Sequence, residues 1–203
     1  MRISKELQKE IDLLSEMEIS EERIDRLSVL ENHLLEELQS KENVILNFIC
    51  THNSRRSMLS QVWSEVLSKY FELPITSVSG GTVATGAYKT VGSTFIAQGM
   101  SVEFIEEGRM NITFSEECDS IELYSKEFGD STPEGESFTA VMTCADVEEN
   151  CPYVPNAVKQ ISLNYEDPKV ADGTPEELDK YLERSRQIGA ELFFVYSSVK
   201  TAL

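Results

Sequence analysis

An almost uninterrupted apolar run at residues 44–49, Val-Ile-Leu-Asn-Phe-Ile, is the feature that most limits how this 203-residue chain can fold. Such runs are typical of strands buried on both faces, as in a parallel sheet covered by helices. A polar loop follows, and apolar residues at helical spacing then predict a helix over 57–70 that ends before Pro74. The alternation continues with strands expected at 75–79, 101–105 and 138–143 and helices at 87–98 and 175–197. The sequence therefore predicts an α/β fold, with a central parallel sheet and helices on both faces.

The first 41 residues precede this alternation and have a different pattern. Apolar residues recur every three or four positions over 3–17 and again over 21–39, which predicts two amphipathic helices. Ser20 can cap the second helix, so we expect an antiparallel helical hairpin over 1–41, followed by an α/β domain over 42–203. The charged residues fall mostly off the apolar stripes, which favours a solvated face over a partner-binding surface.

Two further segments carry turn and capping signals. Glycine, proline and acidic residues are frequent over 108–136, which indicates a surface excursion, with a hairpin that uses 121–124. Residues 174–177, Thr-Pro-Glu-Glu, have the pattern of a capping box with proline at the first helical position. This pattern predicts the start of the last helix.

The charge of the chain excludes several classes of partner. Thirty-six acidic side chains against 18 basic ones give a formal net charge of −18. Nucleic-acid binders need a clustered basic face that displaces counterions, so DNA, RNA and anionic membranes are not expected as partners. No apolar run approaches the roughly 18 residues that span a bilayer, and the charged N-terminus lacks the apolar core of a signal peptide. We expect a cytoplasmic protein.

The residues that carry chemistry are concentrated at 50–57, Cys-Thr-His-Asn-Ser-Arg-Arg-Ser, between the buried strand and its helix. Backbone amides of such a loop can turn inward, and the dipole of the following helix adds positive potential at the same point. A tetrahedral oxyanion therefore fits there. The loop residues expected to surround the anion are Thr51, His52, Asn53, Ser54, Arg55 and Arg56.

Cys50 at the head of this loop is the candidate nucleophile. The positive field of the loop favours its thiolate, which is the reactive form of the side chain. Arg56 can hold two oxygens of the anion with its planar guanidinium, and Ser57 can donate its hydroxyl to the thiolate. A buried core cysteine is the alternative interpretation, but the Cys-x5-Arg-Ser spacing between a strand and a helix favours the nucleophile.

Two more cysteines, Cys144 and Cys151, lie seven residues apart near acidic residues and prolines. Their sulfurs can meet only if the segment folds back or rearranges. No Cys-x2-Cys spacing occurs and the chain has only two histidines, so no metal site is expected. A redox pair is favoured over two inert thiols, because four cysteines are too few for a disulfide scaffold in a chain of this length. Cys118 has no motif around it and is interpreted as structural or incidental.

Three motifs together resemble the thioredoxin-coupled arsenate reductases, which share the fold of the low-molecular-weight protein tyrosine phosphatases. They are the loop at 50–57, the segment 141–152 with its Cys-x6-Cys-Pro spacing, and Tyr-Glu-Asp-Pro at 165–168, in the order found in that family. The resemblance covers about residues 43–200 and implies that 42–203 is a phosphatase-like catalytic domain.

The resemblance also implies roles for single residues. Asp167 is expected to protonate the departing oxygen as a general acid, Asn53 to brace the anion nest, and Ser79 to support that asparagine. Two positions depart from the family pattern, since His52 stands where glycine is usual and Arg55 where a second cysteine is usual. We expect His52 to occupy a positive-φ position, which histidine tolerates better than most residues.

The activity implied by the resemblance is the reduction of arsenate to arsenite by a relay of three cysteines. The Cys50 thiolate attacks arsenate held by Arg56 and the loop amides, while Asp167 protonates the leaving oxygen. Cys144 then attacks Cys50 and releases arsenite, and Cys151 attacks Cys144 to move the disulfide onward. Thioredoxin is the expected external reductant, and no bound cofactor is expected.

Two other functions stay open at this point. A phosphatase on the same fold needs only Cys50, Arg56 and Asp167 and acts through a phosphocysteine. Arsenate and phosphate are close isosteres, so the loop does not easily distinguish them. A regulatory protein that binds an oxyanion, and whose cysteines sense the redox state, is the third interpretation.

Overall fold

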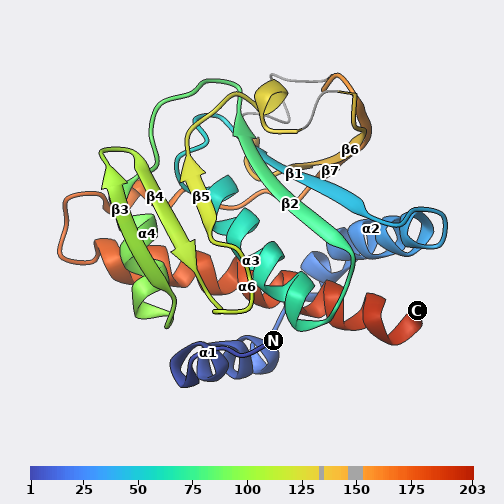
Figure 1. Cartoon of the computed structure of the whole chain (residues 1–203), viewed down its shortest axis with the longest axis horizontal. Helices are drawn as coiled ribbons and strands as arrows, with labels where there is room; N and C mark the ends of the chain where they lie inside the picture. Colours follow the sequence, from blue (N-terminus) through green and yellow to red (C-terminus); the bar gives the residue numbers. More distant parts are fainter. Residues whose placement is uncertain (133–134, 146–152) are drawn as a thin grey trace.

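A four-stranded parallel sheet forms the centre of the computed structural model, which describes residues 1–132, 135–145 and 153–203 (Figure 1). Its strand order is β2-β1-β6-β7, and each neighbouring pair is parallel. The strands are β1 (Val44–Cys50), β2 (Ile75–Gly81), β6 (Phe138–Met142) and β7 (Ala157–Ser162). The predicted α/β fold with a central parallel sheet is confirmed. Strand β7 escaped prediction because it lies at the sheet edge, where its polar residues interrupt the apolar pattern.

Alternate residues of β1 face two different clusters of buried side chains. Leu46 and Phe48 join the main core with the helices, whereas Ile45 and Ile49 belong to a smaller cluster on the other face. The described helices are α1 (Lys5–Glu16), α2 (Glu21–Leu38), α3 (Arg56–Tyr70), α4 (Lys89–Ala97) and α6 (Glu177–Ala202).

The α-helices of the described residues contribute side chains to the main core. Phe128 of the short helix η1 (Phe128–Asp130) packs against the smaller cluster on the other face, which contains Val154, so helical segments lie on both faces of the sheet as predicted. Of the helices in this part of the chain, none combines the length and the apolar content that crossing a lipid bilayer requires.

Both N-terminal helices are present as predicted, with Ser4 and Ser20 as their N-caps. They pack mainly against α6 rather than against each other, so the segment does not form the expected hairpin (Figure 1). Glu10 of α1 pairs with Arg186 of α6 at 2.7 Å. The apolar residues of both helices are part of the main core, which holds them against the rest of the chain.

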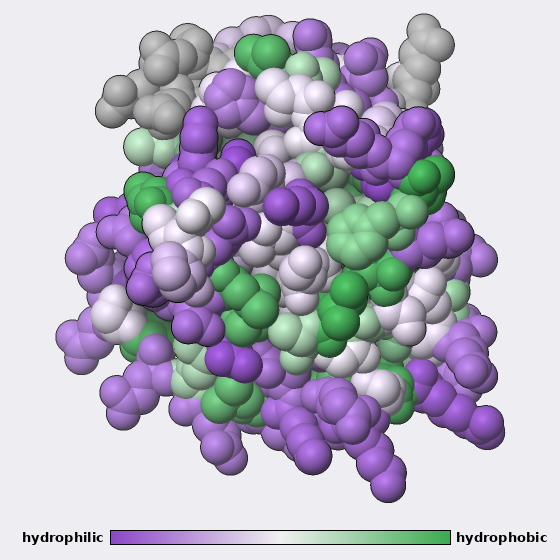
Figure 2. Space-filling view, turned by 90° about the vertical axis from the view of Figure 1, so that its left-hand side faces the viewer, coloured by the Kyte–Doolittle hydropathy of each residue, from purple (hydrophilic) through white to green (hydrophobic). Residues whose placement is uncertain are grey.

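Residues 101–124 build a second sheet beside the first. It is antiparallel and three-stranded, with β3 (Ser101–Glu106), β4 (Arg109–Thr113) and β5 (Ile121–Tyr124) in that order. The strand expected at 101–105 therefore exists but pairs with its neighbour in the chain, because two residues are enough for a hairpin and too few for a parallel crossover. Figure 2 shows this side of the molecule, where apolar patches interrupt a mostly hydrophilic surface and Phe104 and Ile105 of β3 are half exposed.

The capping box predicted for the last helix is wrong. Helix α6 begins at Glu177, and its N-cap Glu176 makes no side-chain capping bond. The Thr174 hydroxyl donates instead to Ala171 O at 2.8 Å. The carboxylate of Glu177 accepts hydrogen bonds from Gly173 N and from the Thr90 hydroxyl, so it fixes the preceding turn to α4.

Buried His33 of α2 should make the stability of the fold depend on pH. Its Nε2 lies 2.7 Å from Thr139 Oγ1 of β6. Burial lowers the pKa of His33, and the charge of Lys159 acts in the same direction. The unfolded chain thus binds this proton more readily, so the stabilisation from neutral His33 is complete above about pH 6.5 and is lost as the pH falls through the lower folded pKa.

The measurement is the free energy of urea unfolding between pH 8 and pH 5 for wild type and His33→Gln. Glutamine preserves a hydrogen bond to Thr139 but does not titrate, so the variant should show a shallower loss of stability toward acid pH. The control is His52→Gln, which replaces the other histidine of the chain, an exposed residue. This variant should lose stability toward acid pH as steeply as wild type. Equal slopes for wild type and His33→Gln would contradict the assignment.

Candidate active site

The loop between β1 and α3 is held through its carbonyl oxygens. Those of residues 50, 51, 52 and 54 accept hydrogen bonds from outside the loop. Because a carbonyl and the next amide of a planar trans peptide point in opposite directions, the amides of the loop turn inward. Among the described residues, none accepts a hydrogen bond from the amides of 52–55. The carbonyl of residue 50 accepts from the Thr82 amide, that of 51 from the Val83 amide and the Thr82 hydroxyl, that of 52 from the hydroxyls of Thr85 and Ser125, and that of 54 from the Tyr88 amide.

Asn53 gives the loop its left-handed residue, with φ at +43°. Its Nδ2 donates to Ser57 Oγ and to Ser79 Oγ, each at 2.9 Å, and its Oδ1 accepts from Lys126 N at 3.0 Å. The expectation of a positive φ at His52 is therefore wrong, because asparagine is one of the few residue types that adopt this conformation readily. The side chain of His52 is exposed.

Strand β2 approaches this loop so closely that residue 81 has no room for a side chain. Gly81 pairs with Cys50 across the parallel ladder. A Cβ at position 81 would lie 2.8 Å from Asn53 N and 2.9 Å from Thr51 O. Glycine is thus required here by the path of the loop.

Cys50 lies at the carboxyl end of β1 and is 3% exposed. Its Sγ is 3.1 Å from Ser57 Oγ. Since Ser57 already accepts a hydrogen bond from Asn53, its own hydroxyl hydrogen is free to point at the sulfur. Helix α3 begins just after the loop, and its N-cap Arg55 makes no side-chain capping bond, so an anion near Cys50 can take that place.

Arg56 is buried against the segment that carries Asp167. Its Nη2 is 2.7 Å from Asp167 Oδ2, and its Nη1 donates to Tyr165 O at 3.1 Å. Its Nε is buried and has no hydrogen-bond partner among the described residues. The guanidinium therefore keeps an unused donor, which an oxyanion in the loop would satisfy.

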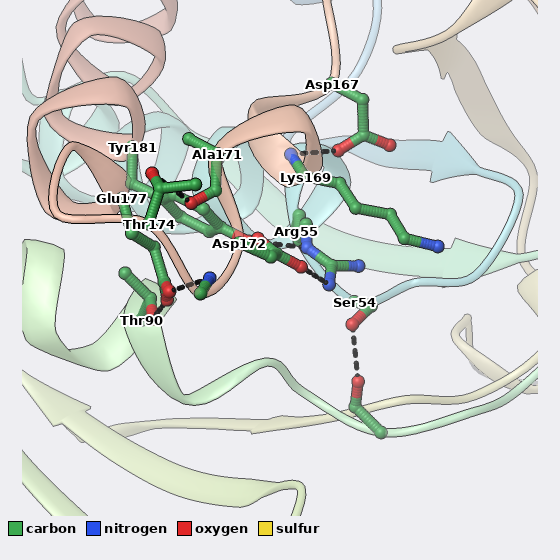
Figure 3. A network of polar contacts seen from close by, with 12 residues as sticks. Ser54, Arg55, Thr90, Asp167, Lys169, Ala171, Asp172, Thr174, Glu177 and Tyr181 are labelled. Carbon is green, nitrogen blue, oxygen red and sulfur yellow. Dashed lines mark hydrogen bonds and ion pairs between the residues drawn. The ribbon is translucent and has the colours of Figure 1, made fainter.

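The side chain of Arg55 does not face the anion nest, contrary to the sequence-based expectation. Its Nη2 is 2.6 Å from Asp172 Oδ2, and its Nε donates to Tyr181 OH at 2.5 Å (Figure 3). Its Cζ lies 4.2 Å from the centre of the Tyr88 ring. The guanidinium of Arg55 thus contacts a carboxylate, a hydroxyl and an aromatic face. Burial and the hydrogen bond to Asp172 raise the pKa of Tyr181, which keeps that hydroxyl protonated.

The side chains of Ser54 and Thr51 also turn toward the surrounding structure. Ser54 Oγ donates to Gly86 O at 2.6 Å (Figure 3). Thr51 Oγ1 lies 3.6 Å from Cys144 Sγ. In this part of the loop, the groups left for a bound anion are the backbone amides of 52–55 rather than the side chains of Thr51, Asn53, Ser54 and Arg55.

Cys144 lies just beyond β6, beside the loop. It is completely buried and belongs to the same small cluster as Cys50. Cys151 lies outside the described residues. Cys118 is half-buried against the main core, and the three described cysteines are free thiols. Within 1–132, 135–145 and 153–203, no group of three metal-ligating side chains comes together.

Sequence reasoning missed four residues that reach this region: Tyr88, Lys126, Asp172 and Tyr181. No motif contains them. The only signal for Asp172 was its own acidic side chain, five positions after Asp167. Lys126 connects the second sheet to the loop through its backbone bond to Asn53. Burial lowers the pKa of Lys126.

The chain is similar to one known protein in sequence and to others in structure. No protein-family model matches the chain. Arsenate reductase from Bacillus subtilis is 28% identical over 152 residues, which span 74% of this chain and 94% of that protein. A mutant of YwlE from Bacillus subtilis superposes with a TM-score of 0.51 at 14% identity, over 78% of this chain and 99% of that one. A low-molecular-weight protein tyrosine phosphatase from the same organism gives a TM-score of 0.51 at 12% identity, over 78% and 98%.

Asn53→Ala should loosen the loop and weaken anion binding. It removes three hydrogen bonds, leaves buried Ser79 and Ser57 without a donor, and keeps the strained φ. We expect a loss of about 1–3 kcal/mol in the free energy of unfolding and weaker competitive inhibition by phosphate. Urea unfolding and phosphate titration measure these two effects. Exposed Asn43→Ala should stay within about 0.5 kcal/mol of wild type, and an equally small effect at Asn53 would disprove its bracing role.

Proposed function

We propose, from a sequence similar to that of an arsenate reductase and a fold shared with low-molecular-weight protein tyrosine phosphatases, that this chain reduces arsenate to arsenite. Cys50 is the nucleophile, and Cys144 and Cys151 are the redox pair. The observation that carries the proposal is a second buried thiol beside the nucleophile's loop, since Cys144 Sγ lies 3.6 Å from Thr51 Oγ1. Transfer of a phosphoryl group to water requires no such thiol.

The first step is attack of the Cys50 thiolate on arsenic. Arsenate lies in the loop, where the inward amides and the free Nε of Arg56 donate to its oxygens. A bond forms between Cys50 Sγ and arsenic, and an arsenic–oxygen bond breaks. Asp167 gives its proton to the departing oxygen, which leaves as water. The carboxyl of Asp167 is one-third exposed, so it recovers its proton from solvent.

The second step transfers two electrons to arsenic. The Cys144 thiolate attacks Cys50 Sγ, a disulfide forms, and the sulfur–arsenic bond breaks with its electron pair on arsenic. Arsenic thereby passes from the pentavalent to the trivalent state, and two thiols are oxidised. Cys151 then attacks Cys144 and frees the Cys50 thiolate. An external dithiol, for which thioredoxin is our candidate, reduces the Cys144–Cys151 disulfide.

The second candidate function is a phosphatase that acts through a phosphocysteine at Cys50. The arrangement of Cys50, Arg56 and Asp167 supports it, because these residues suffice for attack, charge stabilisation and protonation. Water would resolve the intermediate, and Cys144 would be a spectator. Slow hydrolysis of aryl phosphates is expected even from a reductase, since phosphate is isosteric with arsenate.

Cys144→Ser separates these two functions. It should keep hydrolysis of an aryl phosphate within a few-fold, because Cys50, Arg56 and Asp167 are unchanged. Arsenate reduction over many turnovers should vanish, because no thiol remains to attack Cys50. Turnover with thioredoxin, thioredoxin reductase and NADPH measures the second activity. Cys118→Ser is the matched control and should retain both activities, since Cys118 packs against the main core and not in the small cluster of Cys50.

Cys151→Ser should stop after one turnover with Cys50 linked to Cys144. Mass spectrometry of arsenate-treated protein, digested in acid to prevent exchange, should find that crosslink in the variant and a Cys144–Cys151 crosslink in wild type. The phosphatase replaces the reductase as our conclusion if arsenate leaves all three thiols free while aryl phosphate is still hydrolysed.

A further inference from the structure

Two consecutive arginines, Arg55 and Arg56, form ion pairs with the residues at the two ends of one short helix. The helix, η2 (Pro168–Ala171), has Asp167 as its N-cap and Asp172 as its C-cap. Arg56 Nη2 is 2.7 Å from Asp167 Oδ2, and Arg55 Nη2 is 2.6 Å from Asp172 Oδ2. The loop that follows β1 is thus fastened at two points to the segment that carries the candidate acid.

The pair formed by Arg55 is the more completely enclosed of the two. Tyr181 OH accepts from Arg55 Nε and donates to Asp172 Oδ1 at 2.7 Å. The ring of Tyr88 lies under the guanidinium and stacks on Tyr181, with ring centres 5.8 Å apart. The side chain of Asp172 is 21% exposed, against 32% for Asp167. A pair with this many fixed partners keeps its geometry better than an exposed ion pair.

The two pairs respond differently to a bound oxyanion. Arg56 directly follows the loop amides in the chain and keeps a buried Nε without a partner among the described residues, so an anion held by those amides would compete with Asp167 for its guanidinium. The guanidinium of Arg55 contacts Asp172, Tyr181 and Tyr88. An anion in the loop does not compete for these contacts. The contact of Arg56 with η2 therefore weakens when substrate binds, whereas the contact of Arg55 persists.

We propose that Arg55 and Asp172 are positioning residues, which keep η2, and with it the carboxyl of Asp167, beside the reacting oxygen while Arg56 turns to the anion. This inference rests on the proposed function, in which Asp167 is the general acid. It assigns a role to Arg55, the loop residue that departs from the family pattern. Neither Arg55 nor Asp172 touches the substrate.

The test compares aryl phosphates whose leaving groups need a proton to different degrees. Phenyl phosphate expels a strongly basic phenolate, whereas 2,4-dinitrophenyl phosphate expels a stable anion that needs no acid. Asp172→Asn removes the charge of the pair and should lower kcat/KM for phenyl phosphate about tenfold, a fraction of what a general acid contributes. This parameter reports the step in which the leaving group departs, before the phosphocysteine is hydrolysed. For 2,4-dinitrophenyl phosphate, kcat/KM should stay within about twofold of wild type. The first-turnover rate of arsenate reduction should fall with phenyl phosphate hydrolysis.

Four further variants make the result specific. Arg55→Ala should show the same substrate dependence as Asp172→Asn, and Arg55→Lys, which keeps a cation for Asp172, should retain part of the activity that Arg55→Ala loses. Tyr181→Phe keeps the aromatic stack but removes both hydroxyl bonds, and it should show the same substrate dependence at smaller size. Asp179→Asn removes one exposed negative charge from the same helix as Tyr181 and should behave as wild type.

Asp167→Asn separates the possible failures. If this variant slows both aryl phosphates equally, Asp167 is not the acid and the proposed function loses that assignment. If Asp167→Asn slows phenyl phosphate selectively while Asp172→Asn leaves both substrates unchanged or slows both alike, the positioning role is overturned. An unchanged first-turnover rate of arsenate reduction in Asp172→Asn overturns it as well. Circular dichroism and thermal unfolding identify a variant that fails to fold, in which case Arg55→Lys and Tyr181→Phe decide the question.

Discussion

The close approach of β2 to the loop after β1 is the contact on which the site depends. Gly81 lies against Cys50 in the ladder, and the next two amides, of Thr82 and Val83, hold the carbonyls of residues 50 and 51 away from the nest. Turning those carbonyls outward is what turns the amides inward. The shape of the loop is therefore set by a neighbouring strand, which explains why the loop accommodates a residue other than glycine at position 52. The left-handed residue is Asn53, and its three hydrogen bonds stabilise it there.

The strongly negative chain surrounds a site whose two arginines are already paired with acids. Arg55 and Arg56 face Asp172 and Asp167, so these side chains add little net charge before a substrate arrives. The attraction for an oxyanion then comes from the loop amides, the start of α3 and the free Nε of Arg56. These are short-range contributions, whereas the charge of −18 acts at long range. In the proposed function, this difference in range favours a small anion that fits the loop over larger polyanions.

The central strand and the loop were predictable because each has a local signal. An apolar run marks residues 44–49, and the Cys-x5-Arg-Ser spacing marks 50–57. Two features had no local signal. The strand at 101–105 pairs with its hairpin partner because of a short turn, which the alternation of elements does not reveal. The direction in which the Arg55 side chain points depends on Asp172 and Tyr181, more than 100 positions away. No pattern within the loop distinguishes an arginine that binds a substrate oxyanion from one that pairs with a carboxylate of the protein.

The exchange of partners at Arg56 links substrate binding to proton delivery in the proposed reaction. An oxyanion that takes the guanidinium leaves the Asp167 carboxylate without its cation and adds a negative charge nearby. Both changes act on the carboxyl that the proposed reaction uses as its acid. A carboxyl that loses its ion pair is also free to move away, and the second ion pair, five residues along the chain at Asp172, keeps the acid in place at that moment.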